Sequence, residues 1–142
     1  MRIDIKAISI GVIEEYGTND PFKLVDLMDI PLLFHELPET IDAYRLNNII
    51  VINKNLDYVK QKWVLAHEIG HYILHDNCDT YGRYASNSLL IKEKIENEAN
   101  FFASELLLSD IDCYVIEGLT DEQIASLYSV PKKFVRYKLQ GR

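Results

Sequence analysis

Residues 57–75 carry the pattern that most limits what this chain can fold into. Apolar residues recur there with a helical period, and Asp57 is a good N-cap for the helix. On that helix His67 and His71 lie about 40° apart around the axis and one turn apart in height, so they share one face. The opposite face is apolar and should anchor the helix to a core through Leu65, Ala66, Ile69 and Ile73. The histidine face is therefore not simply the exposed side of an amphipathic helix, and we expect the helix to be covered on both sides.

The segment from His67 to His71 has H-E-x-x-H spacing. Two imidazoles so placed can hold one tetrahedral Zn²⁺ from the same side. Glu68 lies about 100° around the helix from His67, so its carboxylate can reach a metal-bound water without ligating the metal. Zinc makes such a water acidic, and the glutamate takes its proton. We therefore predict His67 and His71 as zinc ligands and Glu68 as the catalytic base. The alternative is a pair of histidines that share this spacing by chance.

A catalytic zinc site needs a third protein ligand and one open position. A second long helix is predicted from residue 89 to residue 108, and Glu98 falls at the edge of its apolar stripe. A carboxylate there is costly unless it is paired or bound to a metal. We predict Glu98 as the third ligand, with Glu105 as its competitor on the same side. Glu93 and Glu96 are expected to point elsewhere. The alternative for Glu98 is a peripheral glutamate paired with a lysine.

His75 continues the spacing of the two histidines. It lies about 12 Å along the helix axis from His67, which is too far for one ion to bind both comfortably. We therefore expect His75 to be a hydrogen-bonded or exposed histidine rather than a ligand.

The rest of the chain predicts an α+β fold that is mostly helical with a small antiparallel sheet. Helices are expected over residues 3–17 and after Asp20, which is followed by a proline at the first turn. Segments 41–45 and 49–53 are β-rich and are separated by Leu46, Asn47 and Asn48, which predicts a hairpin. A loop is expected over residues 76–88.

The end of the chain predicts a helix-turn-helix-like pair. Thr120 and Gln123 form a capping-box pattern, and a break at residues 129–131 separates two short helices. We divide the chain into a domain of residues 1–118 and an appendage of residues 119–142 packed on it. The second helix carries basic residues that could contact phosphates, namely Lys132, Lys133 and Arg136.

Composition limits the partners. The formal net charge is −7, which argues against binding nucleic acid with the whole surface, so direct nucleic-acid binding is not expected. No apolar run approaches the roughly 18 residues of a membrane span, and no charged leader precedes a long apolar block. Cys78 and Cys113 do not form a disulfide framework, and we expect free thiols in the cytoplasm; the alternatives are a single bridge or a structural metal role.

The segments from Trp63 to His75 and from Glu96 to Ala103 resemble the ImmA/IrrE family of metallopeptidases. The H-E-x-x-H core is shared by many zincins, whereas its combination with the downstream Glu-Ala-Asn-x-Phe-Ala is far more specific. The resemblance implies a zincin-like fold, Zn²⁺ held at the positions of His67, His71 and Glu98, and Glu68 as catalytic base.

The resemblance also implies a substrate, a helix-turn-helix repressor of a phage, mobile element or stress regulon. A strand at the edge of the sheet would hold the peptide in extended form, and residues 49–53 are the expected strand; the alternative is that they form an ordinary core strand. Tyr72, His35 and His75 are candidates for stabilising the oxyanion by residue type only. Two other functions stay open: a zinc-bearing module that binds a repressor or toxin without cutting it, and a DNA-binding regulator that uses the tail.

Overall fold

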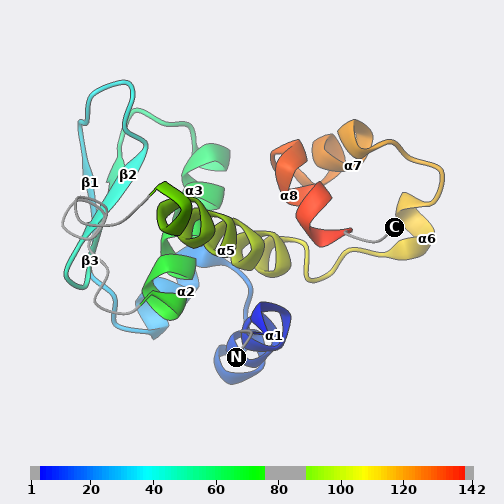
Figure 1. The fold of residues 1–142 in the computed structure, drawn as a ribbon, viewed down its shortest axis with the longest axis horizontal. Helices are drawn as coiled ribbons and strands as arrows, with labels where there is room; N and C mark the ends of the chain where they lie inside the picture. Colours follow the sequence, from blue (N-terminus) through cyan, green and yellow to red (C-terminus); the bar gives the residue numbers. More distant parts are fainter. Residues whose placement is uncertain (1–3, 76–88, 140–142) are drawn as a thin grey trace.

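The computed structural model describes residues 4–75 and 89–139. These residues form seven α-helices and a three-stranded sheet, so the predicted mixed α+β class is confirmed. Figure 1 shows the sheet at one end of the molecule, the helical pair α7 and α8 at the other, and helices α3 and α5 between them. The loop expected over residues 76–88, which includes Cys78, lies outside the described residues.

The sheet contains β1 (Leu32–His35), β2 (Ala43–Leu46) and β3 (Ile49–Asn53) in the order β1-β3-β2. The predicted hairpin is confirmed: β2 and β3 pair antiparallel, and Asn47 adopts a left-handed φ of 54° at the turn. The prediction of a purely antiparallel sheet is wrong, because β1 pairs with β3 in parallel. A four-residue strand with mostly exposed side chains gives no clear alternation, so β1 was not predicted.

The strand predicted to lie at the edge of the sheet is instead its centre. β3 has a neighbour on each side, and four of its five residues are buried. The prediction of residues 49–53 as the edge strand is therefore wrong. On the side of the sheet away from β1, the edge strand is β2.

The first helix ends at Gly17 and the second begins after Asp20, as their sequences predict. In α1 (Ile5–Tyr16), Asp4 accepts a hydrogen bond from the backbone of Ala7, and Gly17 ends the helix with a left-handed φ of 72°. In α2 (Pro21–Leu27), the side chain of Asp20 accepts from the N–H of Phe22 at 3.0 Å.

Helices α3 (Tyr58–Leu74) and α5 (Leu89–Leu107) pack against each other at the centre of the fold. They approach closely at Gly70, where an added Cβ would lie 3.0 Å from the backbone oxygen of Ala99. The apolar side predicted for the first helix is buried and includes Leu65, Ala66 and Ile69. The absence of a side chain at Gly70 therefore lets the polar edges of the two helices meet.

The C-terminal region contains α6 (Cys113–Ile116), α7 (Asp121–Tyr128) and α8 (Lys132–Lys138). The predicted capping box at the start of α7 is present. Phe134 and Val135 of α8 are buried in the same apolar cluster as the α3–α5 core. A division of the chain at residue 118 stays a prediction. No helix among residues 4–75 and 89–139 is long and apolar enough to cross a membrane.

Candidate metal centre

His67 and His71 face each other on one side of α3, as their spacing predicts. Their Nε2 atoms lie 3.1 Å apart, and the two rings meet edge to face with centroids 4.7 Å apart. His71 is 5% exposed, so the pair lies at a covered surface rather than on the outside of the helix. Two imidazole nitrogens therefore point to one position.

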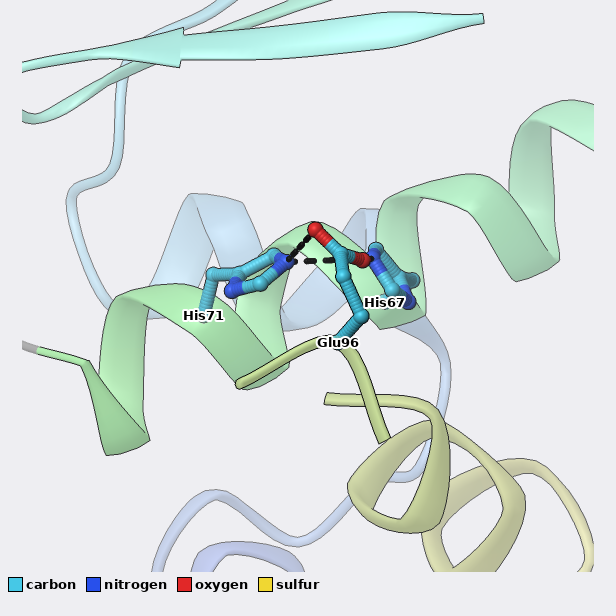
Figure 2. Close-up of side chains that lie close together, drawn as sticks. All are labelled: His67, His71 and Glu96. Atoms are coloured by element: carbon cyan, nitrogen blue, oxygen red, sulfur yellow. Dashed lines mark hydrogen bonds and ion pairs between the residues drawn. The ribbon is translucent and has the colours of Figure 1, made fainter. Parts of the chain in front are cut away.

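Glu96 of α5 brings a carboxylate to the same position. Its Oε2 lies 2.8 Å from Nε2 of His67, and its Oε1 lies 3.3 Å from Nε2 of His71. One ligand atom from each of the three residues falls within 4.8 Å of the other two. Figure 2 shows the three side chains pointing toward one another from two helices. The expectation that Glu96 points elsewhere is wrong.

The structure places Glu98, the predicted third ligand, against a different partner. Its Oε1 lies 2.9 Å from Nε2 of His75, while the competitor Glu105 pairs with Lys138 at 2.9 Å. The apolar stripe of α5 has a polar edge on each side, and Glu96 and Glu98 occupy opposite edges because they are about 200° apart around the helix. The way α3 and α5 cross decides which of these two edges meets His67 and His71. The apolar stripe of α5 does not by itself predict that crossing.

Asn100, one turn after Glu96, contacts the other ring nitrogen of His67. Its Oδ1 lies 2.7 Å from Nδ1 of His67. An amide oxygen only accepts, so the ring donates its Nδ1–H, and Nε2 presents its lone pair. Glu96 and Asn100 have the same four-residue spacing as the two histidines, and this repeated spacing is the signal that the sequence interpretation missed.

Glu68 is buried beside this group. It is 6% exposed, and its Oε1 has no hydrogen-bond partner among the described residues. A buried carboxylate oxygen without a partner costs folding free energy, so its presence points to a functional role. Glu68 therefore keeps an acceptor available at the cavity that it lines with His67 and His71.

The electrostatics of the group favour a cation. Burial alone would lower the pKa of His67, but the hydrogen bond to Glu96 and the charges of Glu68 and Glu96 outweigh it and raise the pKa. Burial would raise the pKa of Glu96, but hydrogen bonds from His67 and His71 hold that pKa well below its ordinary value. Burial, together with the nearby His71, lowers the pKa of His75.

The donor set fits a divalent transition metal. Two imidazole nitrogens and one carboxylate are the ligands of catalytic zinc sites that keep an open position. The lone pair of His67 and the carboxylate of Glu96 are acceptors, and acceptors in close contact need a proton or cation between them. The residues present thus fit a metal ion.

A cavity of about 420 Å³ opens onto the group. One wall is the loop before β2, which Asn53 fixes because its Nδ2 donates to the carbonyls of Leu37 and Ile41 at 3.3 and 3.0 Å. Helix α8 forms another part of the wall. The lining outside the polar cluster consists of Thr40, Ile41, Asp42, Ala43, Trp63, Val64, Lys133 and Phe134.

The three oxyanion candidates do not line this cavity. The ring of Tyr72 lies under the guanidinium of Arg45, with 5.6 Å from Cζ to the ring centroid. His35 ends β1, and His75 contacts Glu98. Lys133, which was predicted only as part of a basic tail, is a cationic side chain on the cavity wall.

Known proteins resemble this chain along most of its length. Residues 25–140 match the family model described as the IrrE N-terminal-like domain. The chain is 35% identical over 138 residues to metallopeptidase ImmA of Bacillus subtilis (strain 168), covering 91% of this chain and 80% of ImmA. It is 34% identical over 140 residues to immunity region protein 2 of Bacillus phage phi105, covering 94% of this chain and 88% of that protein.

A solved structure shares the fold. A Mycobacterium tuberculosis transcriptional regulator superposes with a TM-score of 0.69 at 17% identity, covering 96% of this chain. The match covers 46% of the regulator, so this chain spans less than half of its length.

Proposed function

Because this chain belongs to the ImmA/IrrE family of metallopeptidases, we propose that it is a zinc-dependent endopeptidase that cleaves a protein regulator. The observation that carries the proposal is the convergence of His67, His71 and Glu96 beside the buried, unpartnered Oε1 of Glu68. Three protein ligands with an available base beside them are the usual parts of a catalytic zinc site.

His67, His71 and Glu96 would hold the ion, in place of the originally predicted set with Glu98. A bound Zn²⁺ supplies Lewis acidity, which makes water a better nucleophile and polarises the carbonyl of the scissile bond. The residues of α3 and α5 supply the geometry, because hydrogen bonds to Asn100 and His75 hold the two rings with Nε2 directed at the same position.

Glu68 would act as the general base. Its carboxylate takes a proton from the attacking water and later returns one to the leaving amine, as proton balance across the hydrolysis requires. Its position supports this role, since Oε1 of Glu68 is buried at the cavity and has no hydrogen-bond partner among the described residues.

The edge strand β2 would hold the substrate. Ala43 of β2 lines the cavity, and the hydrogen bond from Asn53 N to Asp42 O sets the pattern of the hairpin ladder. In antiparallel pairing the bonded residues alternate, so Asp42 and Tyr44 bond to β3 while the N–H and C=O of Ala43 point outward. An extended peptide could add to this edge beside the metal donors.

The substrate class we propose is a helix-turn-helix repressor of a phage, mobile element or stress regulon. Support comes from the names of two relatives, metallopeptidase ImmA and an immunity region protein of a Bacillus phage. Location in the cytoplasm, where such repressors act, is part of the same proposal.

A Glu68→Gln variant tests the proposal against the alternative of a non-cutting binding module. The purified protein, loaded with Zn²⁺, is incubated with a helix-turn-helix repressor from the same genome, and fragments are identified by mass spectrometry. We expect cleavage by the native chain, no cleavage by Glu68→Gln, and equal zinc content in both. If Glu68→Gln yields the same fragments as the native chain, or if the native chain yields none, the peptidase proposal is wrong.

Direct DNA binding by the tail is not proposed. Two of the basic side chains on α8 have acidic partners: Lys132 with Glu122 and Lys138 with Glu105. Lys133 lies at the cavity. These two pairings and the net charge of −7 argue against a phosphate-binding surface, and they leave Lys133 and Arg136 as the exposed basic side chains of α8.

A further inference from the structure

A chain of side chains leads away from the metal centre on the side opposite Asn100. Nδ1 of His71 lies 3.1 Å from Nδ1 of His75, and Nε2 of His75 lies 2.9 Å from Oε1 of Glu98. The side chains of His75 and Glu98 are only 8% and 19% exposed. Three polar side chains from two helices are thus joined in a covered line.

The chemistry of the groups orders the protons along this line. A carboxylate accepts only, so His75 must donate its Nε2–H to Glu98. Neutral His75 then has a lone pair on Nδ1, which accepts the Nδ1–H of His71. His71 in turn presents the lone pair of Nε2 to the metal position. The reverse order would place a lone pair of His75 against the carboxylate oxygen at 2.9 Å, which is repulsive.

The backbone fixes the middle of this line. The N–H of His75 donates to the carbonyl of His71 at 2.8 Å, and the carbonyl of His75 accepts from Nη2 of Arg45 at 3.1 Å. Arg45 lies on β2 and is 2% exposed. A cation on the last carbonyls of a helix stabilises its end, so α3 ends where His75 can reach both neighbours.

We propose that His75 and Glu98 are positioning residues of the metal centre, which select the tautomer of His71 and hold its ring with Nε2 toward the ion. A charged acceptor at the far end of such a line also makes the ligating nitrogen a stronger donor. The inference rests on the proposed function, since it assigns the metal to His67, His71 and Glu96. It gives Glu98 a role beside the centre in place of the ligand role expected from the sequence.

The test measures metal affinity, not activity. Zn²⁺ affinity is determined by competition with a chromophoric chelator for the native chain, His75→Phe, Glu98→Gln and the double variant. Glu93→Gln is the matched control, because Glu93 is an exposed carboxylate on the same helix. The visible absorption of the Co²⁺-loaded proteins reports ligand geometry, and thermal unfolding of the metal-free proteins checks folding.

We expect His75→Phe to weaken Zn²⁺ binding roughly 10–100-fold, the usual effect of removing an outer partner of a ligating histidine. Glu98→Gln should weaken it in the same direction and add little in the His75→Phe background, because the residues act in series. The Co²⁺ spectrum should change in both, and Glu93→Gln should match the native chain.

Four results would overturn the inference. Native Zn²⁺ affinity in both single variants would exclude the positioning role of His75 and Glu98 while leaving the metal site intact. Additive losses in the double variant would show that His75 and Glu98 act independently rather than in series, and a loss confined to His75→Phe would remove the role of Glu98. If the native chain binds neither Zn²⁺ nor Co²⁺, the proposed function is wrong, and the positioning role of His75 and Glu98 is wrong with it.

Discussion

The amide oxygen of Asn100 lies 2.7 Å from Nδ1 of His67, on the face of α5 that also carries Glu96. One helix therefore supplies both a donor to the metal position and the acceptor that fixes the tautomer of a ligand on the other helix. A pair spaced by four residues on α3 meets a pair spaced by four on α5.

Removing this acceptor should weaken the metal site without emptying it. For Asn100→Leu we expect Zn²⁺ affinity to fall roughly 10–100-fold, because the ring of His67 loses its orienting partner. Asn100→Asp keeps an acceptor oxygen and should bind Zn²⁺ at least as well as the native chain. Chelator competition measures both, and equal affinity in native and Asn100→Leu proteins would rule out an orienting role.

Replacing Glu96 should be more severe than replacing any outer partner. Glu96→Ala removes a proposed ligand, so its loss of Zn²⁺ affinity should exceed the roughly 10–100-fold expected for outer partners. Glu93→Ala, on an exposed part of the same helix, is the control and should bind normally. Metal content after dialysis would distinguish them, and full occupancy in Glu96→Ala would return the assignment to Glu98.

A methyl group at Gly70 should disturb both the fold and the centre. The added Cβ would lie 3.0 Å from the backbone oxygen of Ala99 and 3.2 Å from its Cα, and backbone atoms cannot move aside as a flexible side chain can. We expect Gly70→Ala to lower the free energy of unfolding by about 1–3 kcal/mol. It should also weaken Zn²⁺ binding, because Glu96 would be pushed away from α3.

Gly11 offers the matched control for that substitution. It lies within α1, and an added Cβ there would meet nothing within 4 Å among the described residues. Gly11→Ala should therefore raise the free energy of unfolding by about 0.5–1 kcal/mol. Urea denaturation measures both variants, and equal effects of the two substitutions would contradict the close crossing at Gly70.

The buried pair of Glu105 and Lys138 should hold α8 on α5. Their side chains are 5% and 14% exposed and lie 2.9 Å apart, so removing one charge leaves the other buried and unpaired. We expect Lys138→Met to cost about 3–5 kcal/mol of unfolding free energy, and Lys138→Met with Glu105→Leu to cost much less. The exposed pair of Lys132 and Glu122 is the comparison, and breaking it should change the thermal midpoint little.

A proline at Ala43 should impair cleavage and leave the metal site intact. The N–H of Ala43 points away from the hairpin ladder, so Ala43→Pro removes a donor from the outer edge of β2 only. We expect a lower kcat/KM with unchanged Zn²⁺ affinity. Tyr44→Pro removes a ladder bond and should instead destabilise the hairpin. A native kcat/KM in Ala43→Pro would show that the substrate does not add to this edge.

Much of the site could be predicted from residues close together in the sequence. Helical spacing placed His67 and His71 on one face, and capping residues such as Asp20 and Asp57 marked where helices begin. These features depend on neighbours a few residues apart, and periodicity and capping report such neighbours directly.

What the sequence did not reveal depends on contacts between distant segments. Glu96 and Glu98 both lie beside the apolar stripe of α5, and only the crossing at Gly70 puts the first of them over His67. The position of β3 was likewise decided by its parallel partner β1, more than ten residues earlier in the chain. The pattern of residues within one helix or strand does not predict which distant segments pack against it.

Phe134 and Lys133 of α8 form part of the cavity wall, although their helix lies far from the H-E-x-x-H segment in sequence. The catalytic compartment is thus closed by a segment that joins it through the connector between α5 and α7. A chain shortened to end before that connector would keep every proposed ligand and the base, and yet it would lack the part of the cavity wall that Lys133 and Phe134 form.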